Sequence, residues 1–192
     1  MNLKDYLSQH FHLPTEITDD LIFSGERKTF AKGEVILPTN SISKNIYFVE
    51  NGLVKMFYYK EDKSITHHFL TENKFITRSE NFYKNNLQNK TSIYGLTALE
   101  NQTVIFQIPF QKVKNWTENS LEMNKLIQQI LVDILRSFSN RLNKIQFENA
   151  QERYQQLLAE NPEIILRAPL GDIASYLGIS QQTLSVIRSQ VK

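Results

Sequence analysis

The stretch Leu170-Gly-Asp-Ile-Ala-Ser-Tyr-Leu-Gly-Ile-Ser-Gln-Gln-Thr-Leu-Ser-Val-Ile-Arg188 has the spacing of two short helices joined by a tight turn. Its apolar residues stand where two crossing helices bury them, at Ile173, Leu177, Ile179, Leu184 and Ile187. Ala174 leaves room at the crossing, and Gly178 fits a turn that needs positive φ and no Cβ. The second helix of such a helix-turn-helix lies in the DNA major groove, so the stretch predicts sequence-specific DNA binding. An ordinary two-helix hairpin is the alternative.

The outward face of the second helix follows from its buried face. If Leu184 and Ile187 face the core, the helical repeat turns polar side chains toward the groove. Gln pairs with adenine, Ser bonds either base, and Val contacts the thymine methyl, while Ser180 is a natural N-cap that also approaches a phosphate. The predicted DNA-contacting residues are Ser180, Gln181, Gln182, Thr183, Ser185, Val186, Arg188 and Ser189. A solvated polar face is the alternative reading of Gln181 and Gln182.

Composition and charge bound the remaining possibilities. The chain has 192 residues, 41% hydrophobic content and a net charge of +2. Segment 149–192 has no net charge, because its basic and acidic residues are equal in number. Neutralisation of phosphates by basic side chains supplies non-specific affinity for DNA. We therefore expect each subunit to bind DNA modestly and binding to depend on dimerisation. No apolar run approaches the roughly 20 residues that cross a membrane, and the first residues lack the apolar block of a signal peptide, so we expect a cytoplasmic protein without membrane contact.

A β-rich region precedes the helical part of the chain. Short runs rich in aromatic and β-branched residues predict strands at Val35–Leu37, Ile46–Val49, Leu53–Tyr59, Ile65–Leu70, Ser92–Tyr94 and Thr103–Ile108. Asn51-Gly52 is typical of a type I′ hairpin turn, and Glu61-Asp62-Lys63 closes the next predicted pair of strands. We therefore expect a small antiparallel sandwich or jelly roll, preceded by helical residues from Met1 to about Ser24.

A long helix should follow Pro109. Apolar residues recur at three- and four-residue intervals from Leu126 to Ile145 without Pro or Gly. The stripe is wider than a single seam, which indicates that one side packs on the β domain and the other on a partner subunit. The predicted dimerisation residues are Ile127, Ile130, Ile134, Phe138 and Leu142. A purely intramolecular core helix is the alternative.

The order of these parts, together with Lys32–Ile36, Ile46–Lys55 and Ile173–Arg188, resembles the Crp/Fnr superfamily of transcription regulators. The resemblance implies an α+β fold with an N-terminal antiparallel β-roll of the cyclic-nucleotide-binding type, a long dimerisation helix and a C-terminal helix-turn-helix domain. We place these parts at 1–118, 119–148 and 149–192. The resemblance also implies a homodimer that binds double-stranded DNA, with RNA polymerase as a further partner.

The chain departs from the cyclic-nucleotide-binding members of this family. Those members hold the ligand phosphate with a short helix opened by Gly-Glu and with an Arg-Ser pair, because an anion needs backbone N–H groups and a guanidinium. Here Asn73–Tyr83 lacks Gly-Glu, Arg78-Ser79 comes about a dozen residues too early, and no Arg lies between Arg78 and Arg136. We therefore expect no response to cyclic AMP. Iron–sulfur clusters are held by cysteine thiolates, and the chain contains no cysteine. We therefore predict no cofactor, and the effector is unknown.

Other chemistry in the sequence is sparse. His67 and His68 on a strand should point to opposite faces and cannot chelate one metal, while His10 and His12 lie outside the roll, so we predict no metal site. Aromatic residues suited to an effector pocket are Tyr47, Phe57, Tyr59, Phe69, Phe75 and Tyr83, although aromatic residues in a small β-roll more often form its core. No catalytic set is apparent, and we predict no enzyme. The alternative function is a small-molecule-binding β-roll whose terminal helices serve assembly.

Overall fold

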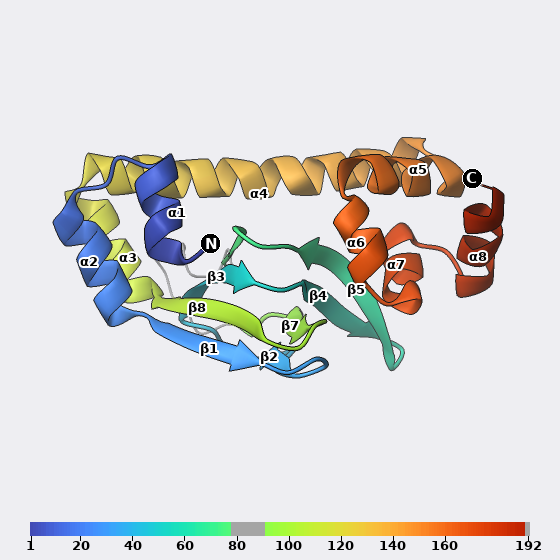
Figure 1. The fold of residues 1–192 in the computed structure, drawn as a ribbon, viewed down its shortest axis with the longest axis horizontal. Helices are drawn as coiled ribbons and strands as arrows, with labels where there is room; N and C mark the ends of the chain where they lie inside the picture. The colour runs from blue at the N-terminus through green and yellow to red at the C-terminus, as the bar shows by residue number, and fades with distance from the viewer. Residues whose placement is uncertain (78–90, 191–192) are drawn as a thin grey trace.

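The computed structural model describes residues 1–77 and 91–190. Two N-terminal helices, α1 (Leu3–His10) and α2 (Thr15–Ser24), precede the eight strands of the described residues, which are followed by α3 (Phe110–Asn119) and the long α4 (Leu121–Phe147). The chain then forms four shorter helices: α5 (Ala150–Glu160), α6 (Pro162–Arg167), α7 (Leu170–Leu177) and α8 (Gln181–Gln190). The predicted α+β architecture of a β-roll, a long helix and a C-terminal helical unit is confirmed (Figure 1).

Within the part of the chain that the structure describes, the strands form two antiparallel sheets of four. The first has the order β1-β8-β3-β6 and the second the order β2-β7-β4-β5. Their bounds are β1 (Glu26–Phe30), β2 (Val35–Leu37), β3 (Asn45–Asn51), β4 (Val54–Lys60), β5 (Lys63–Leu70), β6 (Phe75–Ile76), β7 (Gly95–Ala98) and β8 (Thr103–Pro109). The predicted strand Ser92–Tyr94 lies just ahead of β7, and of its residues Ser92 makes one isolated bridge to Ser41.

The turn at Asn51-Gly52 differs from the prediction. β3 pairs with β6 and β8, whereas β4 pairs with β5 and β7, so this turn carries the chain from one sheet to the other and closes no hairpin. Gly52 has φ 94°, and a Cβ there would lie 2.5 Å from the Thr103 hydroxyl, so the tight crossing requires glycine. The predicted hairpin between β4 and β5 is confirmed, with Glu61 and Asp62 both at positive φ, as a type I′ turn requires.

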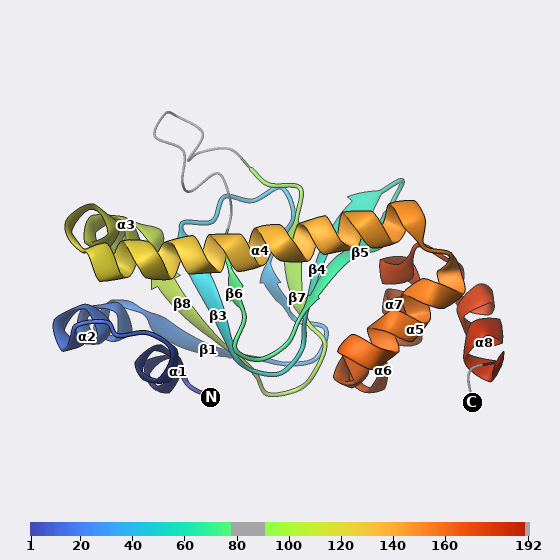
Figure 2. The ribbon, with the colours of Figure 1, turned by 90° about the horizontal axis from the view of Figure 1, so that it is seen from above.

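Three apolar clusters hold the molecule together. One fills the roll between its sheets and includes Val49, Val54, Leu96 and Ile105. The second joins α1 and α2 to α3 and the first half of α4. The third is the core of α5–α8, and it also takes in Leu53, Phe69 and Leu99 from the roll. The helical unit therefore shares its core with the roll, and both lie along α4 (Figure 2).

Candidate functional site

Helices α7 and α8 form the helix-turn-helix that the sequence predicts. Gly178 ends α7 in the left-handed conformation, with φ 70° and ψ 34°, and its N–H donates to the carbonyls of Ala174 and Ser175. At the crossing, Ile173, Leu177, Leu184 and Ile187 are buried, and Ile179 is partly buried against them. The helical register that orients α8 is therefore the one expected from the apolar spacing.

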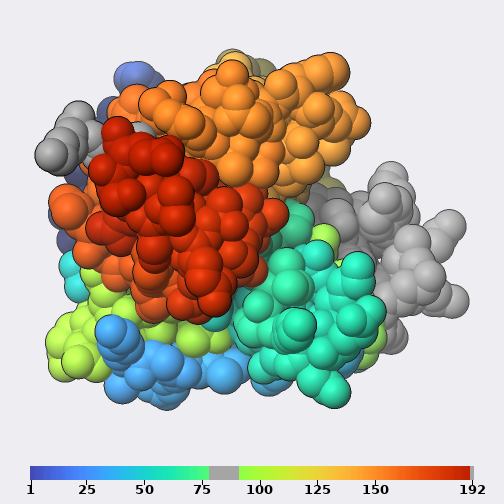
Figure 3. Space-filling model, turned by 90° about the vertical axis from the view of Figure 1, so that its right-hand side faces the viewer, coloured from blue at the N-terminus to red at the C-terminus, as the bar shows by residue number. Residues whose placement is uncertain are grey.

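The N-terminus of α8 is held by Ser180, whose Oγ accepts the backbone N–H of Thr183 at 3.0 Å. A Cβ at Gly171 would lie 2.6 Å from the side-chain amide nitrogen of Gln181, so the absence of a side chain on α7 makes room for Gln181. The spacing of the apolar residues alone does not predict this role of Gly171. All of the predicted DNA-contacting residues are exposed: Ser180, Gln181, Gln182, Thr183, Ser185, Val186, Arg188 and Ser189. Figure 3 shows α8 at the surface of this end of the molecule.

The arginines of the helical unit are used mainly within the molecule. Arg153 donates from Nε to the carbonyl of Leu177 at 3.0 Å, which satisfies the end of α7. The Arg167 guanidinium lies 2.7 Å from a Glu72 carboxylate oxygen and 2.6 Å from one of Glu100. Arg188 is exposed on α8. The exposed face of α8 is therefore polar with a single arginine.

The long helix has two unlike halves. Its first half lies in the chain's own core, where Ile127 and Ile130 are buried and Ile134 packs against the same cluster. The expectation that these three residues face a partner does not fit this placement, because Ile127 and Ile130 are buried, and Ile134 is partly buried, in the chain's own core. The second half carries an exposed stripe at Leu131, Leu135, Phe138, Leu142 and Ile145, which includes two of the predicted dimerisation residues.

That stripe has the spacing of a coiled-coil seam. Its intervals of four, three, four and three residues keep apolar side chains on one line of a helix. Leu135 is 65% exposed and Leu142 is 56% exposed. We call these five residues, Leu131, Leu135, Phe138, Leu142 and Ile145, the α4 seam.

The predicted effector residues are dispersed. Tyr47 is buried in the roll with its hydroxyl 2.6 Å from that of Ser43, Phe57 is also buried, and Tyr59 is 59% exposed. Tyr83 lies outside the described residues, as does the Arg78-Ser79 pair. The other two residues, Phe69 and Phe75, line one cavity of about 300 Å³.

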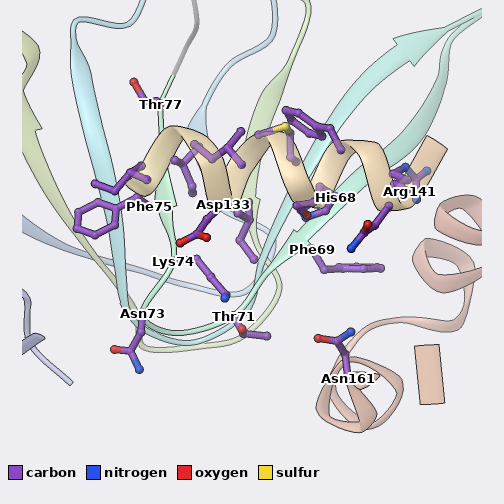
Figure 4. Close-up of a pocket in the computed structure, with 18 of the residues that line it drawn as sticks. His68, Phe69, Thr71, Asn73, Lys74, Phe75, Thr77, Asp133, Arg141 and Asn161 are labelled. Atoms are coloured by element: carbon purple, nitrogen blue, oxygen red, sulfur yellow. The ribbon is translucent and has the colours of Figure 1, made fainter. Parts of the chain in front are cut away.

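This cavity lies beneath α4 at the junction of the roll and the helical unit. Figure 4 shows Asp133 and Arg141 on α4, His68 and Phe69 on β5, the loop residues Thr71, Asn73 and Lys74, and Asn161 from the helical unit. We call it the junction cavity. The roll, α4 and the helical unit all contribute residues to its lining. Residue patterns within any one of these parts therefore do not predict it.

The two adjacent histidines both lie beside α4, contrary to the expectation that they point to opposite faces. The pairing of β4 with β5 shifts at this point, so that His67 is the extra residue of a β-bulge. Both imidazole rings are consequently in contact with Phe138, with centroid distances of 5.5 and 6.0 Å. Burial, aided by the charge of Arg141, lowers the pKa of each histidine to about 4. Among the described residues, no group of three His, Asp or Glu side chains is placed to hold a metal ion.

Polar contacts fix the helical unit against the roll. Besides the Arg167 ion pairs, Asp172 of α7 binds the Lys55 ammonium at 2.8 Å and the Thr66 hydroxyl at 3.2 Å. The backbone N–H of Thr66 donates to the Ser175 hydroxyl at 2.9 Å. We call these contacts of Arg167, Asp172 and Ser175 the roll latch. The first helix of the helix-turn-helix is thus bound to β4 and β5.

Comparison with known proteins agrees with this architecture. Residues 27–120 match the family model of the cyclic nucleotide-binding domain. No curated protein matches the sequence. None of the helices within the described residues is long and apolar enough to span a membrane.

Solved structures extend the likeness beyond the roll. FixK2 from Bradyrhizobium japonicum has 16% identity and a TM-score of 0.75, covering 87% of this chain and 84% of its own. A CooA variant from Carboxydothermus hydrogenoformans has 17% identity and a TM-score of 0.71, covering 99% and 84%. A transcriptional regulator of the Crp/Fnr family from Eubacterium rectale has 16% identity and a TM-score of 0.73, covering 95% and 85%.

These observations describe the fold and the domain composition of the chain. A roll that matches the cyclic nucleotide-binding domain, a long helix and a helix-turn-helix occur here in one chain. Its fold is similar to the folds of these regulators, and residues 27–120 match the cyclic nucleotide-binding domain.

Proposed function

We propose that the protein is a homodimeric, sequence-specific DNA-binding transcription regulator. The observation that carries this proposal is the exposed polar face of α8 on a helix-turn-helix whose apolar residues are buried at the crossing. Gln182 and Ser185 offer donors and acceptors to base edges, and Val186 offers an apolar contact to a thymine methyl. The activity is binding, and no enzymatic role is proposed.

The α4 seam supports dimerisation. Its exposed apolar residues have the heptad spacing that a second copy of the same helix would bury. A dimer would also supply two recognition helices, which compensates for the single exposed arginine on each α8. We place the protein in the cytoplasm, with RNA polymerase as a partner that the family implies.

Cyclic AMP is not the proposed effector. The proposal rests on the sequence, in which the stretch Asn73–Tyr83 lacks the Gly-Glu element that nucleotide-binding members have there. A β-roll that binds a small molecule without binding DNA is the alternative function, and the roll and the junction cavity are compatible with it.

Selection of duplexes from a random pool, followed by titration of the enriched sequence, tests the proposal. The full chain should enrich a sequence with two related half-sites. A Gln182→Ala variant should bind the enriched duplex with altered base preference, whereas Gln155→Ala, on the exposed surface of α5, should bind as the natural protein does. Failure to enrich any sequence would favour the alternative function.

A further inference from the structure

The corner between α4 and α5 is short and closely held. Two residues, Glu148 and Asn149, link the end of α4 to the start of α5. Asn149 and Glu152 form a capping box: the Asn149 side chain accepts the backbone N–H of Glu152 at 3.1 Å, and the Asn149 N–H donates to the Glu152 carboxylate at 2.7 Å. One turn further along α5, the Gln156 side-chain amide donates to the Glu148 carboxylate at 2.7 Å. The direction of α5 therefore follows closely from that of α4.

Arg153 of α5 joins this corner to the helix-turn-helix, and Figure 2 shows the helices that meet at this end of the molecule. Its Nη1 donates to the backbone carbonyl of Glu148, and its Nε donates to that of Leu177 at 3.0 Å. Leu177 is the last residue of α7, and the turn at Gly178 follows it. The last carbonyls of a helix lack partners within the helix and carry the negative end of its dipole, so a guanidinium is favourable there. One partly buried side chain thus ties the end of α4 to the turn that orients α8.

Two further contacts join α4 to the helical unit. The Lys144 ammonium lies 2.6 Å from a carboxylate oxygen of Glu160, which belongs to α5 and is 55% exposed. The Arg141 guanidinium stacks on Tyr176 of α7, 4.1 Å from the centre of the ring. Hydrogen bonds depend steeply on angle, so two of them from one planar guanidinium restrict direction more closely than this stacking does. We therefore expect the angle between α4 and the helix-turn-helix to depend mainly on Arg153.

This angle matters when two copies bind one duplex. The step rests on the proposed function, in which the α4 seams pair at a twofold axis and each α8 enters the major groove of one half-site. The separation of the two recognition helices must then match the spacing of the half-sites. One added base pair moves the second half-site by about 3.4 Å along the duplex and turns it by about 35°. A corner that bends easily accepts several spacings, whereas a rigid corner accepts one.

We propose that Arg153 is a positioning residue that fixes the half-site spacing recognised by the dimer. Its guanidinium bonds main-chain carbonyls of the protein, so it acts on DNA recognition through the angle between α4 and α8. Its loss should broaden the range of accepted spacings and leave the base preference within each half-site unchanged, because the exposed face of α8 determines that preference. Loss of a phosphate contact would instead weaken binding to every duplex alike.

Fluorescence anisotropy with three duplexes tests this role. They carry the half-sites enriched from the random pool at the selected spacing, or with one base pair added or removed between them. The natural protein should bind the two altered duplexes at least about tenfold more weakly, whereas Arg153→Met should bind them at most about threefold more weakly. Arg153→Lys keeps the charge without the planar fork and should give an intermediate preference.

Lys144→Met is the matched control, because it removes a cation from the same corner that contacts α5 through Glu160. It should keep the tenfold preference of the natural protein. An unchanged spacing preference in Arg153→Met, or an equal loss of preference in Lys144→Met, would overturn the proposal.

Hydrogen exchange without DNA gives an independent readout. The backbone N–H groups of Gly178 and Ile179 bond carbonyls of α7. They should exchange faster in Arg153→Met, while those of β3 and β8 keep their natural rates and so confirm that the roll is folded. Unchanged exchange at the turn would overturn the positioning role. If the natural protein enriches no duplex, the proposed function itself fails; if it enriches one and Arg153→Met keeps the spacing preference, the role of Arg153 alone fails.

Discussion

At the scale of single residues, Arg167 forms ion pairs with two carboxylates at once, those of Glu72 and Glu100. Its guanidinium lies between two carboxylates, and its hydrogen bond to Glu100 holds the pKa of that carboxyl below its usual value. Replacing Arg167 with Met leaves Glu72 and Glu100 facing one another. We expect a loss of about 2 kcal/mol in the free energy of unfolding at pH 7, because the groups are only partly exposed and their mutual repulsion is no longer offset.

The pH dependence of this loss has a definite sign. A carboxyl whose pKa is lower in the folded state stabilises the fold above its unfolded pKa of about 4.3, and this contribution disappears as the pH falls through the folded value. Urea unfolding should therefore show that the natural protein and Arg167→Met converge in stability as the pH falls below about 4. Arg136→Met is the control, and an equal loss in both variants would contradict the assignment.

His68 should make the fold sensitive to mild acid. Its pKa is about 4 in the folded state because of burial, against about 6.5 when unfolded, so the unfolded chain binds more protons between these values and stability falls as the pH falls from 6.5 to 4. His68→Gln retains a group that reaches the Ser137 hydroxyl, now 2.9 Å from Nε2, and removes this titration. Urea unfolding at pH 7 and pH 5 should show a smaller decrease for the variant. Parallel profiles would exclude His68 as the titrating group.

At the scale of elements, the orientation of α8 allows a test by insertion of charge. Val186 is 55% exposed, whereas its neighbour Ile187 is buried. Val186→Arg should therefore leave the melting temperature unchanged and tighten DNA binding by adding a guanidinium near bases or phosphates. Gln182→Ala should lose about 1–3 kcal/mol of discrimination at one base position. A lower melting temperature for Val186→Arg without a gain in affinity would show that the side chain faces the crossing.

The α4 seam gives the second test at this scale. Leu135→Asp places a charge in the middle of the exposed stripe, so a dimer would have to bury unpaired carboxylates at its axis. We expect the variant to be monomeric by light scattering and to retain its helical circular dichroism, because the Leu135 side chain is 65% exposed. Asn143→Asp carries the same charge on another exposed face and should remain dimeric. A dimeric Leu135→Asp protein would remove the seam from the proposed interface.

The helix-turn-helix was predictable because its constraints are local. The apolar spacing of Ile173, Leu177 and Leu184 and the glycine of the turn belong to one continuous stretch. Which part of α4 keeps an exposed apolar face was not predictable in the same way. Ile127 and Ile130 have the same periodicity as the exposed seam, and only the packing of α1, α2 and α3 distinguishes them. The bulge at His67 and the crossing at Gly52 likewise depend on which strands pair, which no local pattern specifies.

At the scale of the whole molecule, the roll and the helical unit behave as one packed body. Phe69 of β5 lies 5.3 Å from the Tyr176 ring between ring centroids, and the roll latch adds ion pairs around that contact. The junction cavity is bounded by both parts, so it exists only when they are docked. Of the residues predicted for an effector pocket from the roll alone, Phe69 and Phe75 line this cavity, together with Arg141, Asn73 and Tyr176.

The number of copies that bind one site should also determine the affinity of the protein for DNA. The described part of the helical unit presents a polar α8 with one exposed arginine, so a single copy neutralises few phosphates. Two copies on a palindromic site add their contacts, and the affinity gain is lost when they separate. We therefore expect Leu135→Asp to bind a duplex with two half-sites no better than a duplex with one, whereas the natural protein should prefer the full site by about a hundredfold or more.

Fluorescence anisotropy at fixed salt distinguishes the outcomes of this last prediction, because affinities of this kind are comparable only at one ionic strength. Asn143→Asp should keep the natural preference for the full site, which separates loss of the dimer from the added negative charge. If Leu135→Asp is monomeric and still binds the full site as tightly as the natural protein, recognition resides in one helix-turn-helix. The α4 seam would then serve assembly without contributing to DNA affinity.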